Sequence, residues 1–335
     1  MLDITSFSRG SAARGIAKVW ALAITLACTC AGALAQGFPS KPVRLIVGFA
    51  AGGPTDVVAR AFAEHATRML GQTFIVENKP GANSVLAAEA VAGASADGHV
   101  VLLGATNHTM IPALYGARVK FDAVRSFIPV CTLAESPTLL VTGPSMKVTS
   151  LPGFVQDLQS SPGRRTYGSP GAGSSGHFAG ERFARLTGTA MNHIPYKGAA
   201  PMVTDLIGGQ LDSSFATLGS VLPHIQAGKL TPLAIAASQR SALLPNTPTF
   251  DEAGLRNFRD SAWYGLLVPA GTPTMAVETL EKTARSFSQA PASVEKLRGL
   301  GLSSQNVCGP AFAAQIQREI QSNSQLAKEL NLKVE

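Results

Sequence analysis

Short apolar runs alternate with helical patterns along the first third of the chain. After the apolar run at 42–49, apolar residues recur every three or four positions from Val58 to Met69, which is typical of a helix. A second apolar run at 72–79, a helical pattern at 84–94 and a third run at 98–106 continue the same order. The alternation predicts a mostly parallel α/β sheet with helices over its faces.

The alternation pauses once and then resumes. An apolar run followed by Gly, Pro and Ser at 136–154 is a plausible crossing between two lobes, and a second long apolar strand at 261–273 leads back. About 300 residues exceed the usual size of one domain. We therefore expect two α/β lobes with a ligand cleft between them. Lobe 1 should contain residues 38–139 and 261–335, and lobe 2 residues 140–260.

The N-terminus has the pattern of an export signal. Arg9, Arg14 and Lys18 precede a small and apolar run that ends in Ala33-Leu34-Ala35, a typical signal-peptidase site. A retained membrane anchor would need about 20 apolar residues, usually larger ones. We expect residues 1–35 to be a cleaved signal peptide and the mature protein to be periplasmic.

Cleavage changes the charge. The chain has 28 Lys and Arg against 21 Asp and Glu, and the leader carries three of the former and one of the latter, which leaves a net charge of +5. The basic residues are scattered, whereas a nucleic-acid surface would need a clustered stripe. A weak positive field suits small anions, so we expect no nucleic-acid partner.

Two of the four cysteines, Cys131 and Cys308, lie outside the leader. They would reach a compartment where disulfides are permitted and could pair, although Cys131 in an apolar run could equally be a buried unpaired residue. Neither has a His or a second Cys at metal-ligand spacing, so we expect no metal.

An adjacent glycine pair marks the first strand-to-helix turn. Gly52-Gly53 lies between the strand at 42–49 and a helix that starts at Thr55-Asp56, which places unpaired backbone N–H groups and the positive end of the helix dipole together. That arrangement favours an anion. It is not a P-loop, because no Lys follows the glycines. The alternative is a plain turn in which Thr55 or Asp56 caps the helix.

A second glycine loop also joins a strand to a helix. Gly171, Gly173 and Gly176 fit G-x-G-x-x-G, but the acidic residue expected about 20 positions later in a dinucleotide site is missing. We therefore predict no cofactor. Hydroxyls near these glycines can bind carboxylate oxygens without a counter-charge, and they belong to Ser169, Ser174 and Ser175.

Catalysis by a serine is the alternative function. Ser174 and Ser175 lie close to His177 in sequence, which leaves a secreted α/β serine hydrolase as the second hypothesis. Neither serine is centred in a G-x-S-x-G elbow. His108 lies on another strand-to-helix loop, where it could line the cleft.

Eight segments in order, from about Phe38 to the C-terminus, resemble the solute-binding receptors of tripartite tricarboxylate transporters, also called Bug-type receptors. They are FPSKPVRLIVGFAAGGPTDVVAR, VENKPGAN, DGHVVLLG, YGSPGAGSSGHFAGERF, HIPYKGAAPMVTDLIGGQLD, PHIQAGKLTPLAI, LPNTPTFDEAG and AWYGLLVPAGTP. The resemblance implies a two-lobed periplasmic binding protein, type II-like, that closes on a small organic acid as a Venus flytrap. It implies a monomer that is not an enzyme and that delivers a di- or tricarboxylate to membrane permease subunits.

The resemblance also implies which residues bind the ligand. In this family, strand-to-helix loops of both lobes hold the carboxylates through amides, hydroxyls and water. The matching residues here are Ala51, Gly52, Gly53, Pro54, Thr55 and Asp56, then Thr106, Asn107 and His108, then Ser169, Gly171, Gly173, Ser174, Ser175 and His177, then Tyr196 and Lys197. Ala216 departs from a frequent family pattern that has Asp at this position, and the departure predicts that an acid without an amino group binds better than its amino-acid analogue.

Overall fold

The computed structural model describes residues 37–332, so the predicted signal peptide at 1–35 lies outside the described residues. The chain divides into two units, residues 1–40 and 41–335, and the description below concerns the second. Among the described residues, none of the helices combines the length and apolar character needed to span a bilayer.

The first half of this unit confirms the predicted strand–helix alternation. Parallel strands β1 (Val43–Val47), β2 (Phe74–Asn78) and β3 (Val100–Ala105) lie in the order β2-β1-β3. Helices α2 (Pro54–Leu70) and α3 (Val85–Ala92) connect them. Val43, Leu45 and Val47 point to one face of β1 and have no exposed surface, and Ile46 on the other face is 4% exposed, as expected for a strand covered on both faces.

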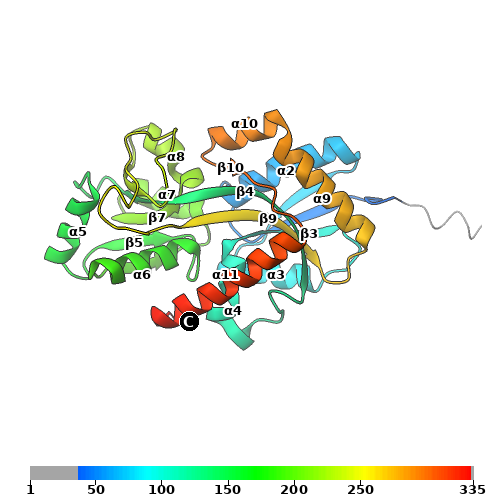
Figure 1. Ribbon diagram of the computed structural model, residues 1–335, viewed down its shortest axis with the longest axis horizontal. Helices are drawn as coiled ribbons and strands as arrows, with labels where there is room; N and C mark the ends of the chain where they lie inside the picture. Colours follow the sequence, from blue (N-terminus) through cyan, green and yellow to red (C-terminus); the bar gives the residue numbers. More distant parts are fainter. Residues whose placement is uncertain (1–36, 333–335) are drawn as a thin grey trace, which may run out of the picture. The chain divides into compact units, whose positions relative to one another are not determined.

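Two long strands join the halves of the sheet. β4 (Phe127–Thr142) pairs antiparallel with β9 (Ser261–Pro269), which also pairs antiparallel with β3. Figure 1 shows β4 and β9 side by side along much of their length. From Thr138 onward β4 leaves β9 and pairs with β7 (Ser213–Thr217) and β8 (Thr231–Ile235). The sheet order continues as β4-β7-β5-β6, with β5 (Thr166–Ser169) and β6 (Asn192–Pro195) parallel to each other.

The remaining elements cover the sheet or connect its strands. They are η2 (Ala82–Ser84), η3 (Thr106–Thr109), α4 (Ile111–Tyr115), η4 (Gly116–Arg118), α5 (Leu151–Ser160), α6 (Ser175–Thr187), α7 (Ala199–Ile207), α8 (Leu218–Gln226), α9 (Thr274–Gln289), α10 (Pro291–Gly299), β10 (Ser303–Ser304) and α11 (Pro310–Glu329).

Each half has its own apolar core. In the first half, Trp263 of β9 packs edge-on against Phe312 of α11, with ring centroids 5.1 Å apart. In the second half, Phe183, Phe215 and Phe258 meet in an aromatic cluster. Burying one such side chain stabilises the fold by about 1.5–3 kcal/mol. These clusters therefore keep the strand ends that border the site in place.

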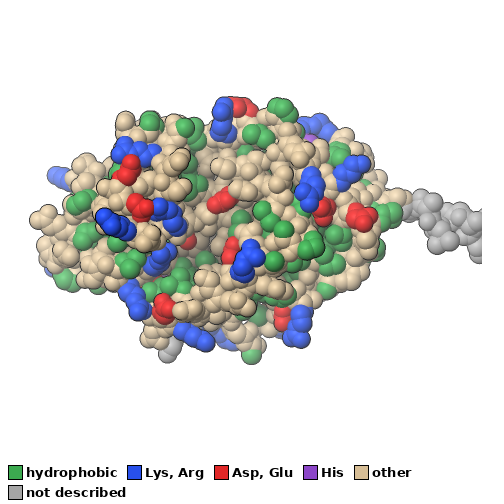
Figure 2. Space-filling model, in the orientation of Figure 1, with side chains coloured by type: hydrophobic (Ala, Val, Ile, Leu, Met, Phe, Trp, Pro, Cys, Tyr) green, Lys and Arg blue, Asp and Glu red, His purple; other side chains and the backbone are tan. Residues whose placement is uncertain are grey.

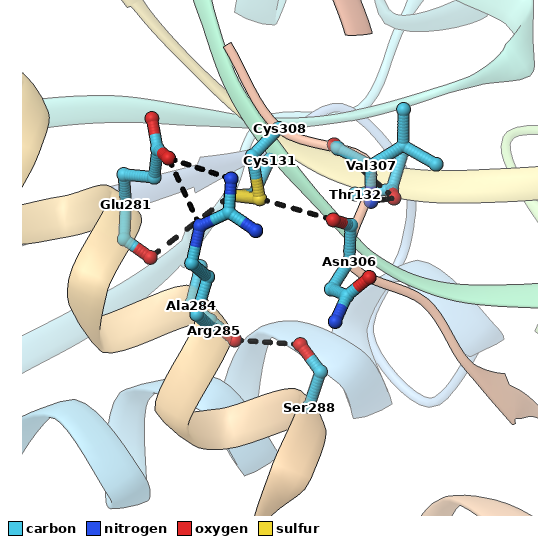
Figure 3. The surroundings of a disulfide bond; sticks show 9 residues. All are labelled: Cys131, Thr132, Glu281, Ala284, Arg285, Ser288, Asn306, Val307 and Cys308. Carbon is cyan, nitrogen blue, oxygen red and sulfur yellow. Dashed lines mark hydrogen bonds and ion pairs between the residues drawn. A yellow bond between two sulfur atoms is a disulfide. The ribbon is translucent and has the colours of Figure 1, made fainter. Parts of the chain in front are cut away.

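The two cysteines form a disulfide, which resolves the alternatives that the sequence left open. Cys131 lies on β4, and Cys308 lies in the segment that precedes α11 (Figure 3). The neighbouring residues Thr132 and Val307 exchange hydrogen bonds of 2.9 Å, from Thr132 N to the Val307 carbonyl and from Val307 N to the Thr132 hydroxyl. The bridge therefore fixes α11 to the central strand.

Charged side chains are interspersed on the face of the molecule shown in Figure 2. Lys and Arg lie among Asp and Glu on that face, as the scattered basic residues of the sequence predict.

Candidate ligand-binding site

A small cavity of about 50 Å³ lies where loops from the two halves of the sheet meet. Its lining residues lie at or just after the ends of β1, β3, β5, β6 and β7, or belong to β9. They are Phe49, Gly53, Pro54, Thr55, Ala105, Thr106, Asn107, Pro170, Ser174, Ser175, Ala199, Thr217, Ala262 and Tyr264. None of these described lining residues is charged. The carboxyl edge of an α/β sheet is the usual place for a ligand.

The first loop ends in the N-terminus of α2. Gly52 has φ of 85°, a left-handed conformation that favours glycine, whereas Gly53 caps the helix with an extended φ of −81°. Pro54 then begins α2. The N–H that proline lacks would have no partner within the helix at this position, so proline does not destabilise it. Amides in the first turn of a helix have no carbonyl partner within that helix. Thr55 in this turn lines the cavity, so its backbone and hydroxyl can meet an anion there.

Asp56 organises this loop. It is 3% exposed, and its carboxylate accepts hydrogen bonds from the Gly52 amide at 3.0 Å, Arg60 Nε at 2.9 Å and Asn78 Nδ2 at 2.9 Å. Burial raises the pKa of Asp56, but the hydrogen bonds and the Arg60 charge outweigh that effect and hold the pKa below its ordinary value. Its oxygens are committed to the loop, and Asp56 does not line the cavity.

The loop before α6 closes the cavity from the second half. Ser174 caps the helix, and its hydroxyl accepts a hydrogen bond from the His177 amide at 3.4 Å. The Gly173 amide donates to His177 Nδ1 at 3.0 Å. Gly173 has φ of 80°, so this turn also needs a glycine.

Two stacked histidines support this loop from beneath. The rings of His177 and His193 are 3.9 Å apart and nearly parallel, and His193 Nε2 lies 2.6 Å from the Ser169 hydroxyl. Burial lowers the pKa of His177 to about 4. Burial, and then the neighbouring His177, lower the pKa of His193 to about 3. Both rings are therefore neutral at pH 7, and neither lines the cavity.

The buried His177 predicts acid sensitivity. Between pH 4 and about 6.5 the unfolded chain binds a proton at this histidine that the folded chain does not bind, so stability falls as pH falls. We expect a loss of up to about 1.4 kcal/mol per pH unit from this residue, and roughly 3 kcal/mol in all. Urea unfolding at several pH values should show this slope, and His177→Gln should reduce it.

His224→Gln is the matched control for that measurement, because His224 is only half-buried and lies outside the loop before α6. An equal pH dependence of the unfolding free energy in wild type and His177→Gln would contradict the prediction.

The third loop is η3, which follows β3. The Thr106 hydroxyl accepts a hydrogen bond from the Trp263 amide at 2.8 Å, and Asn107 Nδ2 donates to the Asn83 carbonyl at 2.7 Å. Thr109 donates its hydroxyl to the Thr106 carbonyl at 2.7 Å. These bonds fix Thr106 and Asn107 against the cavity.

His108, in the same loop, points elsewhere. Its Nε2 lies 2.8 Å from the Ala123 carbonyl, and its ring contacts Phe121 and Phe127. Burial lowers the pKa of His108. It packs in an aromatic cluster and does not line the cavity.

The turn after β6 borders the first loop through its backbone. The Ala50 amide donates to the Lys197 carbonyl at 3.1 Å. The Tyr196 hydroxyl donates to Asp205 at 2.7 Å, and burial, with help from Asp205, raises the pKa of Tyr196 to about 12. The Lys197 side chain is exposed, and neither residue lines the cavity.

The sequence-predicted residues therefore divide into two groups. Those that line the cavity are Gly53, Pro54, Thr55, Thr106, Asn107, Ser174 and Ser175. Those that do not are Ala51, Gly52, Asp56, His108, Ser169, Gly171, Gly173, His177, Tyr196, Lys197 and Ala216. Ala216 packs in the apolar core opposite Leu139, and its neighbour Thr217 borders the cavity instead.

Sequence reasoning missed half of the lining. The missed residues are Phe49, Ala105, Pro170, Ala199, Thr217, Ala262 and Tyr264. Thr217 ends β7 and immediately precedes α8. The rule that ligands bind at strand ends could therefore have identified it. Burial raises the pKa of Tyr264 to about 12, although a hydrogen bond with Thr217 lowers it in part. The Tyr264 hydroxyl is therefore neutral at pH 7.

The geometry does not support the serine hydrolase alternative. No hydrogen bond joins the His177 ring to Ser174 or Ser175 among the described residues, because its Nδ1 accepts from the Gly173 amide. In the loop before α6, the serine that pairs with a histidine is Ser169, with His193, and Ser169 is fully buried. His65 and Ser286 also pair, at 3.2 Å, but neither lines the cavity. A serine nucleophile needs both a base and access to substrate.

The comparisons with known proteins agree with this geometry. The model of the tripartite tricarboxylate transporter family receptor matches residues 58–332. The chain is similar to protein BugT of Bordetella pertussis, at 34% identity over 80% of this chain and 82% of BugT. The solved structure of the periplasmic binding protein BugD has a TM-score of 0.85 at 29% identity, covering 89% of this chain and 100% of BugD.

A protein of R. palustris solved with adipate has a TM-score of 0.86 at 31% identity, covering 89% of this chain and 100% of that protein. The family model matches most of the chain, and the chain is 34% identical to BugT. Together these two findings establish the family. This chain belongs to the tripartite tricarboxylate transporter receptor family.

Proposed function

We propose that this solute-binding receptor captures a small organic carboxylate in the described cavity and releases it to a membrane transporter, without catalysis. One observation carries the proposal. The cavity has uncharged walls and is bordered by the N-terminal ends of α2 and α6, one from each half of the sheet. The adipate bound to the R. palustris relative supports the ligand class.

Uncharged walls fit a receptor that must let its ligand go. Thr55, Ser175 and Thr217 offer hydroxyls, and the first turns of the helices offer amides, so a carboxylate can be solvated without an ion pair. Removing one partner of a buried ion pair leaves the other charge uncompensated, which costs several kcal/mol. A site of dipoles avoids that cost when the ligand leaves.

We further propose that the two halves of the sheet are the two lobes. Lobe 1 would contain residues 41–139 and 261–332, and lobe 2 residues 140–260. The change of partner in β4 at Thr138 supports this division, as does the hydrogen bond of 3.0 Å from the Thr138 amide to the Asp260 carbonyl. The Thr138 hydroxyl also donates to the Asp260 carboxylate, so both crossings meet at one point where the lobes can hinge.

We also propose export to the periplasm and function as a monomer with permease subunits as partners. The leader pattern at 1–35 and the disulfide, which needs an oxidising compartment, support the location. The periplasmic origin of BugD supports it as well.

A thermal-shift screen tests the proposed function. Di- and tricarboxylates of three to six carbons should raise the melting temperature, since ligand at 100 times Kd stabilises by about 2.7 kcal/mol. The fully methylated esters of the same acids are the matched control, because they keep the chain length and remove the charge. We expect no stabilisation by the esters and no change in their concentration by NMR. Hydrolysis of an ester, or the absence of any shift with the acids, would refute the proposal.

A further inference from the structure

The side chain of Asn83, in η2, is buried without a hydrogen-bond partner. The residue is 8% exposed, and neither its Oδ1 nor its Nδ2, both of which are buried, forms a hydrogen bond within residues 37–332. Water bonds to such an amide while it is exposed, so burying it unpaired costs free energy. Buried amides in folded proteins are therefore nearly always paired, and an exception calls for a physical explanation.

The cover over this amide comes from the other half of the sheet. A Cβ added to Gly171 would lie 3.5 Å from Asn83 Oδ1, and one added to Gly173 would lie 3.3 Å from Asn83 Nδ2. Both glycines belong to the loop before α6, in the proposed lobe 2, whereas η2 belongs to the proposed lobe 1. The amide is therefore buried by contact between the two lobes.

Contacts within lobe 1 hold η2 in place. The Asn83 carbonyl accepts a hydrogen bond of 2.7 Å from Asn107 Nδ2 of η3. Ser84 packs on Gly48, which follows β1, so closely that a Cβ on that glycine would overlap the Ser84 hydroxyl. When the lobes open, η2 therefore stays with lobe 1, the loop before α6 moves away, and water can bond to both ends of the amide.

Backbone conformation explains the residue type at this position but not the burial of the amide. Ala82, Asn83 and Ser84 have φ of 45°, 51° and 74°, in the left-handed region where asparagine is enriched. Asn257 also has a left-handed φ, of 61°, and it is exposed. Burial between the lobes distinguishes Asn83 from Asn257.

Apolar contacts between the lobes act in the opposite direction. A Cβ added to Gly173 would overlap Leu114 Cδ1, so this side chain of α4 packs directly on the loop before α6. Leu114 also shares an apolar cluster with Met110 and with Phe178 of α6. Burial of these side chains stabilises the closed form, and burial of the Asn83 amide destabilises it.

We propose that Asn83 is a positioning residue that sets the balance between the open and closed forms, because its unpaired amide favours opening. The proposal rests on the proposed lobes and on the proposed function. One buried unpaired group shifts an equilibrium by roughly five- to 150-fold. Because the affinity for ligand falls with the fraction of receptor that can close, Asn83 weakens binding and speeds release.

Replacing Asn83 by leucine tests the proposal by a gain of affinity. Asn83→Leu keeps a similar side-chain volume and removes the amide, so it should bind at least about fivefold tighter than wild type and release its ligand more slowly. Leucine is strained in a left-handed turn, but the strain is present in both forms and cancels in the affinity. Structural damage would weaken binding, so a gain is specific to the proposed role.

The probes are succinate, glutarate, adipate and citrate, titrated by calorimetry, with release of the tightest binder followed by stopped flow. Asn257→Leu is the matched control, because it makes the same change at an exposed left-handed position and should leave the affinity within about twofold of wild type. Melting temperatures show that each variant is folded.

Asn83→Asp gives a second measurement if Asn83→Leu does not fold, because aspartate tolerates the same backbone conformation. Its carboxylate would be buried between the lobes without a counter-charge, so binding at pH 7.5 should be at least about tenfold weaker than in wild type.

A folded Asn83→Leu that binds no tighter than wild type would overturn the inference and leave the proposed function intact. An Asn83→Asp that binds as tightly as wild type would do the same. Failure of all four acids to bind wild type would overturn the proposed function and this inference with it.

Discussion

Replacing Gly53 by valine should weaken binding of the best acid by roughly 100-fold, because overpacking a closely packed site costs about 1–3 kcal/mol. Gly53 lines the cavity beside Thr55, and a Cβ added to it would lie 3.7 Å from the Ala199 Cβ. That contact is ordinary, so alanine fits. The two methyl groups of valine would instead occupy a cavity of only about 50 Å³ and would block the approach to the first turn of α2.

Steric filling, and not backbone strain, is the expected mechanism. Gly53 has φ of −81°, which any residue adopts, and the positive φ of this loop belongs to Gly52. Gly53→Val should therefore remain folded by circular dichroism. Gly53→Ala is the matched control and should bind within a few-fold of wild type.

Lys197→Ala separates an anion held by dipoles from one held by a cation. The Lys197 side chain is exposed and lies outside the cavity lining, so its removal should change only the on-rate and the salt dependence. Calorimetry at two salt concentrations makes the comparison. Normal binding by Gly53→Val together with lost binding by Lys197→Ala would show that our interpretation of the loop is wrong.

Removing the disulfide should lower the free energy of unfolding by about 2–5 kcal/mol. The bridge joins residues 177 positions apart, and the loop-entropy model gives about 5 kcal/mol for a loop of that length. The bridge also affects how α11 is held against the rest of the fold. Cys308 precedes α11. Glu319 of α11 accepts a hydrogen bond from Trp263 Nε1 at 2.8 Å, and Asn323 Nδ2 of α11 donates to the Thr109 hydroxyl at 2.8 Å, which connects α11 to η3.

The double variant Cys131→Ser and Cys308→Ser is the appropriate form, because a single substitution would leave a free thiol. Urea unfolding of wild type and of the variant, each with and without reductant, measures the effect. Reductant should destabilise wild type only. A loss smaller than about 1 kcal/mol, or an equal response of the variant to reductant, would contradict the prediction.

The architecture could be predicted from sequence where local pattern determines it. The strand–helix alternation from β1 to β3 follows from periodicity and glycine turns, and the structure confirms it. The helix predicted to start at Thr55-Asp56 begins one residue earlier, at Pro54. The family resemblance is confirmed by the family model, and the two-lobed α/β fold class by the solved relatives. Thr55 and Ser175 could be placed at the cavity because both lie in the first turn of helices that follow strands.

The rest of the site depends on distant contacts that no local pattern contains. Tyr264 reaches the cavity because β9 pairs antiparallel with β3 about 160 residues earlier, and its apolar run shows no sign of a site. His108 and His177 have the chemistry of site residues, yet their nitrogens pair with the backbone of Ala123 and Gly173. Residue type and loop position identify the segment, whereas the side chains that face the ligand follow from tertiary packing.

A crystal structure with the best-binding acid tests the central claim most directly. We predict one carboxylate of the ligand within hydrogen-bonding distance of Thr55 and the first turn of α2, and within reach of Ser174 or Ser175 from the other half of the sheet, with no Lys or Arg side chain in contact. An acid bound in any other pocket, or a carboxylate paired with the Lys197 ammonium, would contradict the account.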